Sequence, residues 1–174
     1  KLKTLLGQHN PHMQASLSKR WIFTLHHAAN TMELAKALYL DKPEEMFLAV
    51  IFSDIAAFLL ADKLSKKDIN VGEQEFYKKA DEYKYHYAQK ALKNWNFNPN
   101  IIDMMSNTPT LSHSLTEMDV IQLAYFHMKG DKKIEEQIEY LKLPISAQIC
   151  QGGNKLLILK NKEDGIKKLV ASLI

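Results

Sequence analysis

Hydrophobic residues recur in this chain at steps of three and four positions, which is the spacing of one buried helical face. The first long run predicts a helix at about 14–40. Its expected buried face consists of Leu17, Trp21, Leu25, Ala28, Met32, Ala35 and Tyr39. A later run predicts a helix over 73–95. Its expected buried face consists of Phe76, Ala80, Tyr83, Tyr87, Ala91 and Trp95.

Between these two helices lies a stretch, Pro43–Ala61, that is apolar on every side from Met46 onward, with Ser53 and Asp54 as its polar exceptions. Such a stretch predicts a helix in the middle of the core. Asp41 is expected to cap it, and proline suits the first turn, where its missing N–H costs nothing. A lone buried carboxylate costs several kcal/mol or more, so Asp54 must be hydrogen-bonded, ion-paired or bound to a metal.

The downstream pattern is helical as well. Asn98–Pro99 predicts the start of a short helix. Either Ser114 or Thr116 is expected to open another, and Thr116 with Asp119 resembles an imperfect capping box. Helices are also expected over 131–143 and, from the spacing of its apolar residues, over 165–174, while the segment 155–160 fits either a short strand or a buried helical turn. With no alternation of strands and helices, the sequence predicts an all-α multi-helix bundle.

Length and composition indicate one folded unit. At 174 residues the chain can bury a substantial core, and we divide it into a helical domain over 1–145 and a C-terminal extension over 146–174 that packs on it. A hydrophobic fraction of 46% and a charged fraction of 25% are ordinary for a globular protein. The single cysteine, Cys150, excludes an internal disulfide and favours a reducing compartment, so we expect a cytoplasmic protein.

Charge and hydropathy argue against two classes of partner. The net charge of +3 is mild, and the lysine-rich segments Lys63–Lys67 and Lys160–Lys168 lack interleaved aromatic residues, so nucleic acid is not an expected partner. The central apolar stretch is interrupted by Asp54 and shorter than the ~20 residues of a membrane span, so no membrane partner is expected either.

Four residues of ligand type follow one another on the predicted helices, His26, His27, Asp54 and His86, and Asp119 lies further along the chain. Imidazole and carboxylate groups suit a divalent metal that activates water for phosphoester hydrolysis. The alternative is that these histidines are surface residues or hydrogen-bonded core residues, as histidines on amphipathic helices more often are. Spacing alone does not decide whether the four side chains converge.

Over about residues 15–130 the chain resembles the HDOD family, a branch of the HD-domain superfamily. The family has a helix with a tryptophan followed by a histidine–serine and small residues, a helix of the form P-E-x-A-F-x-A-G-L-L-H-D-I-G, and a helix that ends in a tryptophan and a proline. The matching stretches here are Trp21–Ala29, Pro43–Ala57, and Ala88–Trp95 followed by Pro99. The resemblance implies a helical bundle of the HD/HDOD type.

The chain departs from the family at the positions that hold the metal in HD enzymes. The resemblance puts Ser53 where the histidine of the His-Asp pair lies, and leaves only Asp54 of that pair. It puts Phe23 at the first histidine position, Lys84 near the third, with His86 two residues away, and Tyr125 at the final acidic position. A catalytic metal needs about three protein ligands, so we expect no metal and no other cofactor.

Two functions stay open from the sequence. The resemblance implies a non-catalytic regulatory or interaction module in bacterial signal transduction, which contacts a protein partner such as a signalling protein, or a regulatory nucleotide. The alternative is a metal-dependent phosphohydrolase whose ligands have moved to His26, His27, Asp54 and His86. In the first case Asp54 is structural, and because the family packs the two helices side by side, His26 or His27 is the expected donor to its carboxylate.

Overall fold

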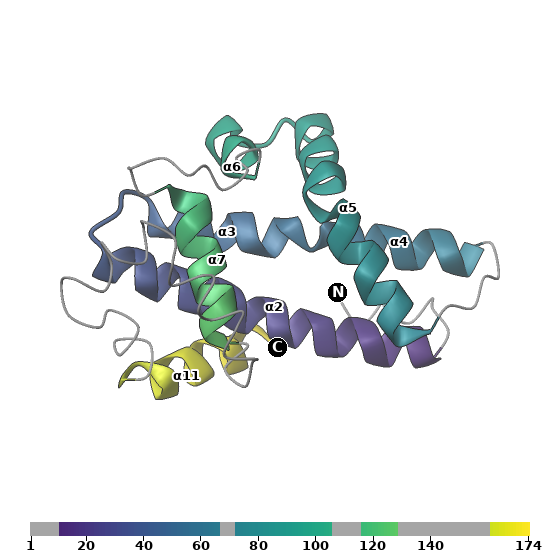
Figure 1. Ribbon diagram of the computed structural model, residues 1–174, viewed down its shortest axis with the longest axis horizontal. Coiled ribbons are helices and arrows are strands. Elements are labelled where there is room, and N and C mark those ends of the chain that lie inside the picture. The colour runs from purple at the N-terminus through teal and green to yellow at the C-terminus, as the bar shows by residue number, and fades with distance from the viewer. Residues whose placement is uncertain (1–10, 67–71, 106–115, 129–160) are drawn as a thin grey trace.

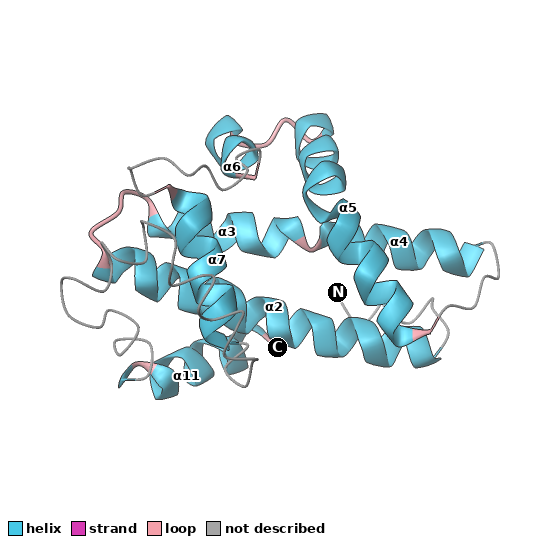
Figure 2. Ribbon diagram, in the orientation of Figure 1, coloured by secondary structure: helices cyan, strands magenta, loops and turns pink. Residues whose placement is uncertain are grey.

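The computed structural model of the chain describes residues 11–66, 72–105, 116–128 and 161–174, and these residues are helical with no strand among them (Figure 2). The predicted all-α class is therefore confirmed. The described helices are α2 (Pro11–Ala37), α3 (Pro43–Ser53), α4 (Ile55–Lys66), α5 (Glu73–Asn94), α6 (Pro99–Met104), α7 (Glu117–Met128) and α11 (Glu163–Leu173). The expectations for 131–143 and 155–160 lie outside the described residues.

The longest helix, α2, forms one side of the bundle and runs antiparallel to α3 and α4, which follow each other along the same axis (Figure 1). Helix α2 packs against α3, α4, α7 and α11, while α5 packs against α3, α4 and α6. None of the described helices is long and apolar enough to cross a lipid bilayer.

The central apolar stretch is two helices rather than one, because the chain breaks its helical geometry at Asp54. The Asp54 N–H bonds to Ile51 O at 3.3 Å, and the Ala57 N–H bonds to Asp54 O at 3.0 Å, so both bonds span three residues instead of four. Such bonds form a tighter turn than an α-helix. The uniform apolar pattern of the stretch could not reveal this turn, since it leaves the hydrophobicity on both sides unchanged.

The helix starts were predicted with mixed success. The prediction that Asp41 caps α3 is wrong. The N-cap residue is Lys42, which has a left-handed backbone conformation (φ 60°) and whose side chain forms no capping hydrogen bond. In contrast, Asn98 caps α6 by accepting from the Asn100 N–H. The Thr116 capping box also forms, since the Thr116 N–H donates to the Asp119 carboxylate and the Asp119 N–H donates to the Thr116 hydroxyl.

The predicted buried face of α5 is wrong in its second half. Phe76 and Ala80 are buried, but Trp95 is 58% exposed, and Tyr83 and Tyr87 are 46% and 36% exposed. The buried positions after Ala80 instead are Ala88 and Leu92. Ala88 and Leu92 belong to the main hydrophobic core, whereas the aromatic residues that suggested the stripe keep polar groups near water. Tyr39 is also exposed, because it follows the end of α2 in a left-handed conformation.

The C-terminal helix packs on the rest of the bundle. Ile166 and Val170 of α11 belong to the main hydrophobic core, and Lys162 forms an ion pair of 2.6 Å with Glu33 of α2. The boundary at 145/146 stays a prediction, because it lies outside the described residues.

Candidate functional site

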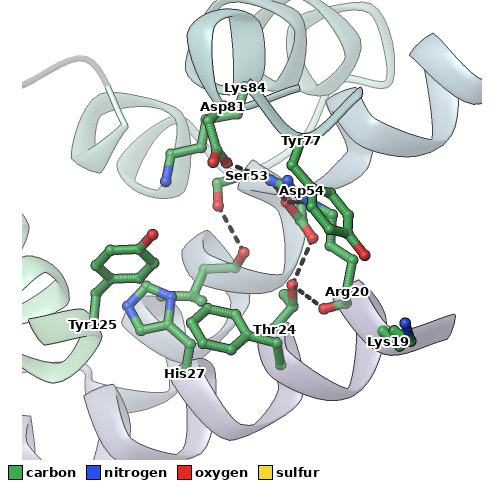
Figure 3. Close-up of a pocket in the computed structure, with 12 residues that line it drawn as sticks. Lys19, Arg20, Thr24, His27, Ser53, Asp54, Tyr77, Asp81, Lys84 and Tyr125 are labelled. Atoms are coloured by element: carbon green, nitrogen blue, oxygen red, sulfur yellow. Dashed lines mark hydrogen bonds and ion pairs between the residues drawn. The ribbon is translucent and has the colours of Figure 1, made fainter. Parts of the chain in front are cut away.

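A polar band separates two hydrophobic cores of the bundle. The main core includes Leu25, Val50 and Ala88, while a smaller core at the other end includes Leu17, Ala57 and Ala80. Residues of α2, of the α3–α4 segment, of α5 and of α7 near this band line a pocket of about 440 Å³. The described residues that line it are Lys19, Arg20, Phe23, Thr24, His27, Val50, Ser53, Asp54, Tyr77, Asp81, Lys84 and Tyr125 (Figure 3).

Asp54 is the buried charge at the centre of this band, and protein donors hold both of its oxygens. Arg20 donates from Nε at 2.7 Å and from Nη2 at 2.5 Å to Oδ1. The Thr24 hydroxyl lies 2.5 Å from Oδ2 and 3.0 Å from the Arg20 carbonyl oxygen. Its single hydrogen goes to the carboxylate, since a charged acceptor at shorter range forms the stronger bond. The expectation that His26 or His27 donates to Asp54 is therefore wrong.

Arg20 also joins a third helix to this pair. Its Nη2 lies 2.7 Å from Oδ1 of Asp81 on α5, a carboxylate that is half exposed. Burial opposes the charge of Arg20, but the hydrogen bonds and the attraction of Asp54 and Asp81 outweigh it, so the pKa of Arg20 lies above its ordinary value. The guanidinium is permanently charged and cross-links α2, the α3–α4 turn and α5.

His27 is a buried imidazole that bonds to the backbone of α7 and not to Asp54. Its Nε2 lies 2.8 Å from Ile121 O. Because a carbonyl oxygen only accepts, Nε2 is the protonated nitrogen of the neutral ring. Burial lowers the pKa of His27 to about 4, the bond to Ile121 opposes this effect, and the charge of Lys84 adds to it. His27 is thus a neutral residue of the core at physiological pH.

One end of the pocket combines aromatic rings with a cation. Phe23, His27 and Tyr125 contact one another edge to face or tilted, with ring centroids 5.4 to 6.5 Å apart. The Lys84 ammonium lies 5.7 Å from the centroid of Tyr125, and it faces the hydroxyl groups of Ser53 and Tyr125 across the pocket (Figure 3). The Ser53 hydroxyl donates to Val50 O at 2.8 Å.

The structure brings together the positions that the family resemblance singled out, with one exception. Phe23, Ser53, Asp54, Lys84 and Tyr125 all line the same pocket. His86 does not line it: this residue is exposed on α5, and its ring contacts Tyr87.

The displaced ligand set does not converge. His26 lines a second pocket of about 450 Å³ between α2, α7 and α11, together with Asn30, His127 and Glu163. His27 faces Ile121 and His86 is exposed on α5. Among the described residues, no three His, Cys, Asp or Glu side chains are arranged to hold a metal ion. The one acidic group at the family's metal position is neutralised by a guanidinium, so these residues do not fit a catalytic metal.

Sequence reasoning missed the two donors that satisfy Asp54. Arg20 is the only arginine in the chain, and Thr24 follows it at the four-residue spacing of one helical face. A buried carboxylate on one helix and a lone arginine on its neighbour are the two halves of a bidentate pair, which lysine does not replace. That combination was the available signal. Asp81 gave no such signal, because it is one of several acidic residues on α5.

No protein-family model, curated protein or solved structure shows significant similarity to this chain.

Proposed function

We propose that this chain is a non-catalytic helical regulatory module of the HDOD type, which acts in bacterial signal transduction by binding a ligand or protein partner. The observation that supports this proposal most is the state of Asp54. Its two oxygens accept from Arg20 and Thr24, so the acid that would hold a metal in an HD enzyme is instead part of a buried ion pair.

The other groups in the pocket that could perform chemistry are engaged as well. Ser53 donates its hydroxyl hydrogen to a main-chain carbonyl, and His27 bonds to Ile121 and keeps a low pKa. A serine nucleophile needs a base within hydrogen-bond reach, and no bond between His27 and Ser53 is formed. A pocket whose acid, base and hydroxyl are held by structural bonds is suited to binding rather than to turnover.

The convergence of the five family positions supports the HDOD part of the proposal. Residues from α2, the α3–α4 segment, α5 and α7 line one pocket although about a hundred positions separate Phe23 from Tyr125. No specific observation favours the phosphohydrolase with displaced ligands, because His26, His27 and His86 point to different parts of the molecule.

Hydrolysis assays test the proposal. The protein is incubated with Mn²⁺, Mg²⁺ or Fe²⁺ and with bis(p-nitrophenyl) phosphate or a cyclic dinucleotide, and Asp54→Asn is the matched variant. We expect the same background rate for the parent and the variant. Metal-stimulated turnover that the parent shows and Asp54→Asn lacks would overturn the proposal.

A further inference from the structure

The charges of the pocket are divided between its two ends. At one end Arg20 faces two carboxylates, Asp54 and Asp81, and the neighbouring Lys19 lines the pocket as well, so positive and negative charges balance there. At the other end lies the Lys84 ammonium. Among the described residues no carboxylate lies within ion-pair distance of Lys84, and the ring centroids of Tyr85 and Tyr125 lie 4.7 Å and 5.7 Å from its ammonium nitrogen.

The surroundings of Lys84 favour the binding of an anion. Aromatic faces hold an ammonium group, but they accept no hydrogen bond of the strength that a carboxylate or phosphate accepts. The Lys84 side chain is only partly exposed, so its attraction for an anion is less screened than that of a surface lysine. The hydroxyl groups of Tyr125 and Ser53 face the same space (Figure 3).

The apolar residues that line the pocket next to Lys84 determine which non-anionic part of a ligand can bind there. Phe23 and Tyr125 present apolar surface, and a pocket of about 440 Å³ has the size of a small-molecule site. A simple inorganic anion would leave this surface uncovered. At the far end, Arg20 is already paired with Asp54 and Asp81.

We propose that this pocket binds a small organic anion, in which one carboxylate or phosphate group contacts Lys84 and Tyr125 and a flat apolar body lies against the ring of Phe23. The inference deepens the proposed function and rests on it, since it names the class of ligand through which the module is regulated. The headgroup chemistry is shared by carboxylates and phosphate esters, and the probes below separate the two.

Titration calorimetry on the full chain tests the inference with benzoate, phenyl phosphate, neutral benzamide and inorganic phosphate. We expect saturable binding of benzoate, of phenyl phosphate or of both, tighter than that of benzamide and of inorganic phosphate. Lys84→Met keeps the length of the side chain and removes its charge, so it should weaken the bound probe about tenfold or more. Tyr125→Phe should weaken it less, because the ring remains.

The matched control is Lys90→Met, an exposed position on the same helix outside the pocket, which should leave the affinity unchanged. Absence of saturable binding of both anions in the millimolar range, or equal affinity in the parent and Lys84→Met, would overturn the inference. Circular dichroism of each variant shows that it is folded. If phenyl phosphate binds and is hydrolysed, the proposed non-catalytic function is wrong but the anion site is supported. If neither anion binds and nothing is hydrolysed, the anion site is wrong but the non-catalytic function is unaffected.

Discussion

Arg20 and Asp54 form a buried ion pair in which two guanidinium N–H groups, at 2.7 and 2.5 Å, meet one carboxylate oxygen. The side chains are 11% and 6% exposed. The pair lies between the two hydrophobic cores and joins α2 to the turn at which α3 ends and α4 begins. Because both groups would be costly to bury alone, each depends on the other for its place in the fold.

Two substitutions at Asp54 separate its volume from its charge. We expect Asp54→Ala to lower the free energy of unfolding by about 3–5 kcal/mol, since it leaves Arg20 and Thr24 without their acceptor and creates a cavity. Asp54→Asn should cost less, because the amide keeps one acceptor and nearly the same volume. Urea unfolding of the parent and the two variants measures the order.

The control for the two Asp54 variants is Asp81→Asn, which removes the charge of the half-exposed second carboxylate on the same arginine. Its expected cost is about 1 kcal/mol or less, as for other exposed ion pairs. Equal stability of the parent and both Asp54 variants would contradict a structural role. If binding of a partner were lost at the same time, Asp54 would face a ligand instead of the core.

The pH dependence of the free energy of unfolding should show the titration of His27. The unfolded chain protonates this residue below about its ordinary pKa of 6.5, whereas the folded chain does so only below about 4. Between these values the unfolded state binds more protons, so the free energy of unfolding falls as the pH decreases through this window and this contribution levels off below it. The full difference is on the order of 3 kcal/mol.

The variant that isolates this effect is His27→Gln, which keeps a donor for Ile121 O and does not titrate. Burial lowers the pKa of His127 as well, against the opposing charge of Glu163, so the parent alone would mix the two histidines. Urea unfolding between pH 4 and 7 should give a shallower slope for His27→Gln than for the parent. Identical slopes would mean that His27 titrates normally in the folded protein.

The C-terminal helix is expected to be part of the folding unit. Ile166 is 4% exposed and belongs to the main core, so Ile166→Ala should cost about 2–4 kcal/mol through lost burial and a cavity. Leu173→Ala, at a 46% exposed position of the same helix, is the control and should cost much less. If both variants unfold at the urea midpoint of the parent, α11 does not contribute to the cooperative core.

The sequence was sufficient for the features that depend on local pattern. The start of α3 at Pro43, the Asn98 cap and most of the buried face of α2 follow from rules that act within one helical turn. The sequence was insufficient for features that depend on contacts with residues distant in the chain. The turn at Asp54 and the inward position of Lys84 depend on contacts with α2 and α7, and no periodicity along one helix contains that information.

The same limit applies to the candidate site. The buried carboxylate could be predicted from its apolar surroundings, but its partner could not be chosen from one chain, and the family resemblance favoured histidines over the true donors, Arg20 and Thr24. The shift of the α5 face has a similar origin, because burial at Ala88 and Leu92 is set by helix packing and not by the size of the residues.

The most direct test of the account is the metal content of the protein, purified without chelator and then dialysed against Mn²⁺, Fe²⁺ or Zn²⁺. The parent and Ser53→His, which restores the histidine of the family's His-Asp pair, are measured beside Asp54→Ala by mass spectrometry of the metals. We predict no stoichiometric metal in any of them, since Arg20 and Thr24 hold both oxygens of Asp54. One equivalent of metal in the parent that disappears in Asp54→Ala would contradict the account.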